Sequence, residues 1–164
     1  MLLADVTSLA QSNKNKDEPS PKKDEVNTLL KQEFELEDKG DFAAAIEISK
    51  KICKLQPNDP RPLNTIAGLY GKLGKFEEEI TWAKEAIAVD SQYAPAYVNL
   101  GNALASSGKL AEAQIIFSKA AELAPKDPLA VYSLGVIAEQ ENKPYEALGF
   151  YNKSVELDPK FENG

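Results

Sequence analysis

Turn-forming residues recur in this sequence at a fixed distance of 34 positions. Gly40, Gly74 and Gly108 are separated by this step, and the next step along the chain reaches Asn142. A repeat of this length is one supersecondary unit that buries its apolar face only by stacking on similar neighbours. The period therefore requires an array of stacked units rather than a fold built around one irregular core.

Each unit has the pattern of two short amphipathic helices. In the third unit the apolar spacing predicts helices over about residues 94–107 and 110–123, with Gly108 between them. Glycine supplies the left-handed backbone that ends the first helix, and asparagine, present at Asn142, is the next-best residue for this conformation. Pro125 follows the second helix and ends it, because proline cannot donate a backbone hydrogen bond.

The third unit contains the stretch NLGNALASSGKLAEAQI, in which small residues alternate with larger apolar ones. Glycine inside a helix costs roughly 0.5–1 kcal/mol relative to alanine, so we expect a close helix contact to offset this cost. Gly101 on the first helix is predicted to meet Ala113 and Ala120 on the second helix where the two cross. Larger side chains fill the space beside this crossing: Leu100, Leu104, Phe117 and Leu123.

The segments NLGNAL and SLGVIA, the Gly-Lys-Leu and Gly-Asp-Phe turns and the closing prolines resemble the tetratricopeptide repeat. The resemblance implies an all-α fold, a right-handed superhelix (α-solenoid) of helix-turn-helix units. It also implies a scaffold for protein–protein interaction. The predicted repeats are residues 26–59, 60–93, 94–127 and 128–161.

Two charged residues depart from the repeat pattern. Glu33 stands where Gly101 stands two units later, and Glu79 replaces the small Ala113. The first unit is the least regular, as a terminal repeat often is. Residues 77–79 are three glutamates at the start of a helix, where acidic side chains complement the helix dipole, so we expect all three to be solvated.

Charge and composition restrict the function. The formal net charge is −7, whereas phosphate backbones and anionic membranes need clustered lysines and arginines, so nucleic acid is disfavoured as a partner. No apolar run reaches the length of a membrane span, and the start of the chain lacks the features of a secretory signal. We therefore expect no direct membrane insertion and a cytoplasmic location.

Reactive side chains are scarce. The sequence has no histidine, which excludes Ser-His-Asp and Cys-His arrangements, and its one cysteine, Cys53, is expected to be a small buried apolar residue. We therefore predict no catalytic residue, no metal site and no cofactor, and a chain that is not an enzyme.

A peptide of a protein partner is the ligand that the sequence favours. In arrays of this type the first helices line a concave groove, and an apolar stripe beside amide and hydroxyl groups suits a peptide. Asn99 or Asn102 would bond the peptide backbone, whereas Val98 and Val136 have the alternative of packing between units. The candidate groove residues all lie on predicted first helices: Leu30, Phe34, Arg61, Asn64, Thr65, Val98, Asn99, Asn102, Leu129, Tyr132, Ser133 and Val136.

Other partners remain as hypotheses. The main alternative is a structural assembly module, a homo-oligomer formed through repeat edges or the N-terminal tail; a nucleic-acid reader is the weakest. Some members of the family hold the acidic C-terminal tail of heat-shock chaperones with a clamp of lysine, asparagine and arginine side chains. The matching positions here hold no cation, which disfavours that ligand: Leu30, Phe34, Thr65, Pro95 and Asn99.

The N-terminal residues 1–25 are predicted to be a tail and charged linker. The stretch NKNKDEPSPKKD is charged, contains proline and has no apolar period. Ser20 and Pro21 have the residue types that cap and begin a helix. Ahead of the linker, four apolar residues share one face of a short helix that either reaches a groove or stays passive: Leu2, Leu3, Val6 and Leu9.

The last predicted helix leaves an apolar edge. Leu148, Tyr151 and Val155 are spaced three and four apart, on the face where a following helix would stack. We expect the chain to be a fragment of a longer array, with residues 162–164 at the start of a truncated following unit. We also expect self-association through this edge at high concentration.

Overall fold

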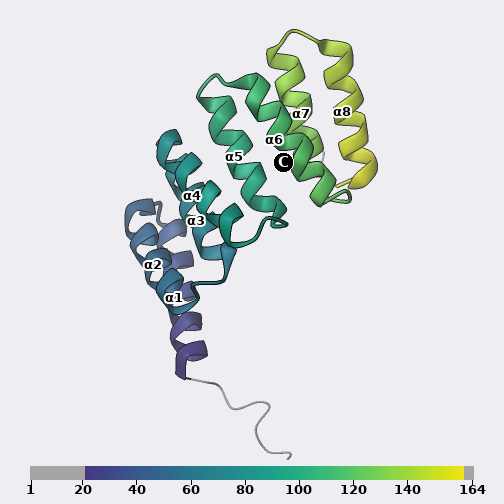
Figure 1. The fold of residues 1–164 in the computed structure, drawn as a ribbon. Helices are drawn as coiled ribbons and strands as arrows, with labels where there is room; N and C mark the ends of the chain where they lie inside the picture. The colour runs from purple at the N-terminus through teal and green to yellow at the C-terminus, as the bar shows by residue number, and fades with distance from the viewer. Residues whose placement is uncertain (1–20, 161–164) are drawn as a thin grey trace, which may run out of the picture.

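The computed structural model describes residues 21–160, and this part of the chain folds into eight α-helices joined by short turns (Figure 1). The all-α prediction is confirmed, and the helices expected at about 94–107 and 110–123 are α5 and α6. The helices are α1 (Pro21–Asp38), α2 (Phe42–Leu55), α3 (Pro60–Lys72), α4 (Phe76–Val89), α5 (Ala94–Ser106), α6 (Leu110–Leu123), α7 (Pro128–Gln140) and α8 (Pro144–Leu157).

A left-handed residue ends the first helix of every unit, as the 34-residue step predicts. In the third unit the N–H of Lys109 donates to the carbonyl oxygen of Leu104 at 2.9 Å, which closes the last turn of α5. The left-handed residues are Gly40 (φ +74°), Gly74 (φ +70°), Gly108 (φ +76°) and Asn142 (φ +59°).

Aspartate followed by proline begins the first helix of the second and fourth units. A side-chain oxygen of Asp59 and of Asp127 accepts a bond from the backbone N–H two residues later, at 3.0 and 2.9 Å. Pro60 and Pro128 take the first helical position, where the missing N–H has no helical partner to lose.

The units stack in chain order and form a solenoid. Within a unit the two helices pack on each other, and each second helix also packs on the first helix of the next unit, as α2 does on α3, α4 on α5 and α6 on α7. Direct contacts also join α3 to α5 and α5 to α7. Figure 1 shows the result as an array with α1 at one end and α8 at the other.

Gly101 lies at the crossing of α5 and α6, as predicted, but its partner differs from the expected one. A Cβ atom at Gly101 would lie 2.5 Å from Cε1 of Phe117, so the missing side chain makes room for an aromatic ring. Ala113 and Ala120 are buried on the same helix without being the groups that require a glycine. The ring of Phe117, expected beside the crossing, fills it.

The same two positions hold a different pair in each unit. In the first unit the hydroxyl of Ser49 donates to the carboxylate of Glu33, and both residues are buried. Burial raises the pKa of Glu33. The pairs in chain order are Glu33 with Ser49, Ala67 with Ala83, Gly101 with Phe117, and Gly135 with Tyr151.

Glu79 is not solvated, so that expectation was wrong. Its side chain is buried in the first turn of α4, at 4% exposure, while Glu77 and Glu78 are exposed. A Cβ atom at Gly71 would lie 2.6 Å from Oε2 of Glu79, which shows that the glycine of α3 makes room for the carboxylate. Burial raises the pKa of Glu79 to about 7.

Several sequence predictions lie outside the described residues. These are the tail and linker within residues 1–20, including the apolar face of Leu2, Leu3, Val6 and Leu9, the cap at Ser20, and the unit start at 162–164. The first described residue, Pro21, begins α1.

Candidate peptide-binding groove

The twelve predicted groove residues all lie on α1, α3, α5 and α7, the first helices of the units. Two separate pockets open along these helices. We name them the C-terminal pocket, between α5 and α7, and the N-terminal pocket, between α1 and α3.

The C-terminal pocket has a volume of about 380 Å³ and brings together five of the predicted residues. Those five are Asn102, Leu129, Tyr132, Ser133 and Val136. The other described lining residues are Ala105, Ser106, Phe117, Ile137 and Gln140, so none of the described side chains around this pocket carries a charge.

Aromatic contacts hold one wall of the C-terminal pocket. The rings of Tyr132 and Tyr151 lie 5.3 Å apart, centroid to centroid, at a tilt of 41°. The hydroxyl of Tyr151 donates to Oε2 of Glu139 at 2.7 Å, and burial together with this bond raises the pKa of Tyr151 to about 12. Tyr151 therefore stays neutral and supports Tyr132, whose own side chain is 42% exposed toward solvent.

Amide and hydroxyl groups supply the polarity of the C-terminal pocket. The hydroxyl of Ser133 donates to the carbonyl oxygen of Leu129 within α7 at 2.9 Å, so its remaining capacity is that of an acceptor. Asn102 and Gln140 are exposed and carry side-chain amides, each with donor and acceptor atoms. The pocket thus offers groups that donate and accept hydrogen bonds beside an apolar surface.

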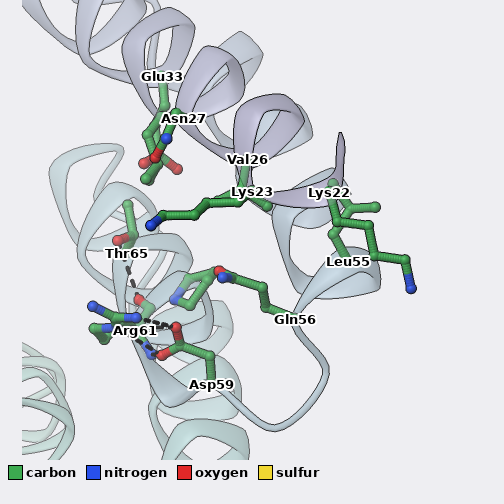
Figure 2. Close-up of a pocket in the computed structure, with 12 residues that line it drawn as sticks. Lys22, Lys23, Val26, Asn27, Glu33, Leu55, Gln56, Asp59, Arg61 and Thr65 are labelled. Atoms are coloured by element: carbon green, nitrogen blue, oxygen red, sulfur yellow. Dashed lines mark hydrogen bonds and ion pairs between the residues drawn. The ribbon is translucent and has the colours of Figure 1, made fainter. Parts of the chain in front are cut away.

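The N-terminal pocket has a volume of about 460 Å³ and is rich in charge (Figure 2). Three predicted residues, Leu30, Arg61 and Thr65, line it. Figure 2 shows Lys23 extending from α1 into the pocket. The remaining lining residues are Lys22, Val26, Asn27, Glu33, Leu55, Gln56, Asp59 and Pro62.

An ion pair between Asp59 and Arg61 lies in the lining of the N-terminal pocket, at the start of α3. Oδ2 of Asp59 lies 2.6 Å from a terminal guanidinium nitrogen of Arg61, and the same carboxylate caps α3. Hydrogen bonding to Arg61 lowers the pKa of Asp59. The hydroxyl of Thr65 donates to the carbonyl oxygen of Arg61 at 3.2 Å. The charge of Arg61 is thus already shared with Asp59 before a ligand arrives.

Three predicted residues between the pockets have roles within the fold. The side-chain amide of Asn99 donates to the carbonyl oxygen of Asn64 at 3.1 Å and to its Oδ1 at 2.9 Å, which links α5 to α3. Val98 is 7% exposed and belongs to the core, which favours the alternative of packing between units. Phe34 lines neither pocket and is 73% exposed on α1.

The predicted edge residues on α8 divide into two groups. Leu148 is 55% exposed and Val155 is half-buried. Tyr151 points into its own unit instead, because Gly135 lacks the Cβ atom that would lie 2.5 Å from the ring. Tyr151 therefore packs on α7 of its own unit, at the position equivalent to that of Phe117.

Sequence reasoning missed several lining residues that the repeat period could have identified. Asn27 lies 34 positions before Arg61, and it lines the N-terminal pocket. Gln140 lies one helical turn beyond Val136 on the same face of α7 and lines the C-terminal pocket. No signal in the sequence identified Lys22 and Lys23, the two lysines of α1 that line the N-terminal pocket. Their place beside this pocket depends on how α1 and α3 approach each other in the stacked array.

Comparison with known proteins shows which family model and which relatives match this chain. Residues 64–128 and 98–160 match the model of the tetratricopeptide repeat family. Small glutamine-rich tetratricopeptide repeat-containing protein 2 of Mycosarcoma maydis is 34% identical over 100 residues, which cover 61% of this chain and 28% of that protein. The chain spans under a third of the length of the first curated relatives that it matches, at 28%, 13% and 13%.

Solved structures share the fold. The crystal structure of MamA has a TM-score of 0.66 and 28% identity, with 77% of this chain and 74% of that chain covered. The first tetratricopeptide repeat domain of Spaghetti (RPAP3), bound to an HSP90 peptide, has a TM-score of 0.66 and 24% identity, covering 73% of this chain and 94% of that one. Among the described residues, none of the helices combines the length and apolarity that crossing a bilayer requires.

Proposed function

This chain belongs to the tetratricopeptide repeat family, and from that premise we propose that it is a non-enzymatic interaction scaffold whose groove binds a peptide segment of a partner protein. The C-terminal pocket is the proposed anchor point. The peptide would place an uncharged, apolar side chain against Tyr132 and Phe117 while Asn102 and Gln140 bond its backbone.

The observation that carries this proposal is the composition of the C-terminal pocket. Five residues chosen from sequence for a peptide groove converge on one hollow with aromatic walls and uncharged polar groups. Pockets that bind ligands are commonly apolar with a few placed polar groups. A peptide complex of a fold relative, the Spaghetti domain with its HSP90 peptide, is consistent with this use of the architecture.

The proposal is tested by selecting peptides from a phage-displayed random library on the whole chain and measuring their affinities for variants. Tyr132→Ala and Asn102→Ala should each weaken the selected peptides about tenfold or more, because both remove groups at the centre of the pocket. Tyr145→Ala and Asn152→Ala are matched controls, since both residues are exposed on α8 away from the pocket.

The control variants should bind the selected peptides as tightly as the unaltered chain. Circular dichroism and thermal unfolding of each variant would verify that the array is folded. Peptides that bind Tyr132→Ala and Asn102→Ala with unchanged affinity would overturn the C-terminal pocket as the site.

A further inference from the structure

Three helices of this array show how a first helix stacks on the unit before it. Three positions, spaced i, i+4 and i+7, are buried in each of α3, α5 and α7. These positions form the stacking face, which packs on the preceding second helix. They are occupied by Pro62, Ile66 and Leu69 in α3, by Ala96, Leu100 and Ala103 in α5, and by Ala130, Leu134 and Ile137 in α7.

The stacking face of α1 has a different character. The equivalent residues Thr28, Gln32 and Glu35 are polar and exposed. No described helix precedes α1, so within residues 21–160 no second helix packs on these three positions. The N-terminal end of the array is therefore a solvated surface.

The other end of the array exposes a leucine on its last described helix. Leu148 of α8 occupies the position of Ile46 in α2 and Ile80 in α4, which are buried and half-buried, and of Gln114 in α6. Exposure at this position rises from 3% at Ile46, which is followed by α3, to 55% at Leu148. Within residues 21–160 no helix follows α8, so its receiving face, defined by Leu148 and Val155, lacks the first helix that covers the others.

The repeats specify what would cover this receiving face. In every other unit the occupant is a helix with apolar or small residues at i, i+4 and i+7. A second copy of the array cannot supply α1 for this purpose, because burying Thr28, Gln32 and Glu35 against leucine and valine would leave polar groups without partners. Head-to-tail stacking of copies is thus disfavoured.

One segment of this chain outside the described residues has the required spacing. Leu2, Val6 and Leu9 stand at i, i+4 and i+7. We propose that residues 2–9 bind the receiving face of α8 as a short helix, with Leu2, Val6 and Leu9 in the places that Ile66 and its neighbours take on α2.

The linker between this segment and α1 sets how far the segment can reach. The 11 residues from 10 to 20 span about 36–40 Å when extended. A helix of this size is marginal alone in water, so it forms on the surface that it covers. Where the linker spans the distance to α8 of its own chain, the tether raises the effective concentration of the segment toward the millimolar range, whereas binding to α8 of a second copy depends on the protein concentration.

The experiment uses the chain shortened by residues 1–10 and a synthetic peptide of residues 1–12. Removal of the tail leaves all eight described helices, and circular dichroism checks that they persist. Addition of the peptide should shift the amide resonances of Leu148 and Val155 and leave those of Asn102 and Tyr132 unchanged. Shifts confined to Asn102 and Tyr132 would overturn the proposal in favour of a groove ligand.

Paired variants of the whole chain supply the control. Val6→Asp should raise hydrogen exchange of the exposed side of α8 about tenfold or more, as deletion of residues 1–10 does. Ala4→Asp adds the same charge on the opposite face of the proposed helix and should have no such effect. The proposal would be overturned if the unaltered chain, the Val6→Asp variant and the shortened chain exchanged equally at α8. It would also be overturned if Val6→Asp and Ala4→Asp had equal effects.

Light scattering after size exclusion then distinguishes binding of residues 2–9 to α8 of their own chain from binding to α8 of a second copy. A dimer that dissociates on Val6→Asp places the segment on a second copy, and a monomer protected at α8 places it on its own chain. A dimer unaffected by Val6→Asp but dissociated by Leu148→Asp would show that two α8 faces cover each other, which contradicts the proposal.

Discussion

The ring of Phe117 lies over the backbone of Gly101, at a place where a Cβ atom on the glycine would be 2.5 Å from Cε1 of the ring. The two residues belong to different helices of the third unit and are both buried. Since the second unit uses Ala67 and Ala83 at the same positions, glycine with a large ring and alanine with alanine are two solutions to one packing problem.

A double-mutant cycle tests this relationship. Gly101→Ala should lower the free energy of unfolding by about 1–3 kcal/mol through overpacking, despite the better helix propensity of alanine. Phe117→Ala should cost about 3–5 kcal/mol by leaving a cavity. The double variant reproduces the Ala67 and Ala83 pair, so its loss should be smaller than the sum of the two. Additive losses in urea unfolding would contradict direct packing.

The buried Glu33 depends on Ser49 in a similar way. Ser49→Ala should lower the free energy of unfolding by about 1–3 kcal/mol, because the carboxyl group of Glu33 then loses its side-chain donor in a buried place. Combining Glu33→Ala with Ser49→Ala removes both polar groups, and the double variant should be more stable than Ser49→Ala alone. Urea denaturation of the three variants measures the difference, and a still less stable double variant would refute the dependence.

The buried Glu79 should make stability depend on pH. Its pKa is raised to about 7 in the folded chain, so the folded state keeps a proton that the unfolded state releases near its ordinary pKa of about 4.3. The stability that this group contributes is complete below that value and is lost as the pH rises to about 7. Glu79→Gln should therefore raise the melting temperature near pH 8 and have little effect near pH 4.

Glu78→Gln provides the matched control for this pH effect, because Glu78 is the exposed neighbour of Glu79 in the same turn. The gain from Glu79→Gln near pH 8 should be on the order of 3–4 kcal/mol, the free energy that corresponds to a rise in pKa from about 4.3 to about 7. A gain that is the same at both pH values would show that burial of the charge is not its cause.

Asn99 is expected to act on stability between units. Asn99→Ala removes both bonds to Asn64 and should cost about 1 kcal/mol. Asn64→Ala removes only the bond to its side chain and should cost less. Hydrogen exchange at the contact of α3 with α5 would report the loss locally. Full stability of Asn99→Ala together with weakened peptide binding would instead assign Asn99 to the ligand.

Some features of the fold were predictable because they follow from backbone geometry and the period. The left-handed turns needed glycine or asparagine, and both Gly108 and Asn142 were identified from their spacing. The burial of Glu79 was not predicted, because acidic side chains at a helix start interact favourably with the helix dipole whether they are buried or exposed. Its register 34 positions before the buried Ala113 was the better guide to its surroundings.

The candidate site was predictable in its helices and less so in its side chains. Tyr132 and Asn102 lie in a pocket, whereas Val98 on the same predicted stripe lies in the core. Residues that face the groove and residues that pack between units lie next to each other on one stripe of a helix. Spacing alone therefore does not distinguish the two kinds of residue. The partner of Gly101 was missed for a related reason, because a missing Cβ can admit a ring as well as a close backbone.

The two pockets differ in charge, so the effect of ionic strength on the affinity of a ligand reports which pocket the ligand occupies. The described lining of the C-terminal pocket is neutral, while the N-terminal pocket is lined by Lys22, Lys23 and Arg61 beside Glu33 and Asp59. Salt at 0.1 M largely screens the interaction between exposed charges more than about 10 Å apart, this distance falls to about 3 Å at 1 M, and apolar contacts are almost unaffected. A ligand confined to α5 and α7 would bind equally at low and high salt, and one that extends to α1 would not.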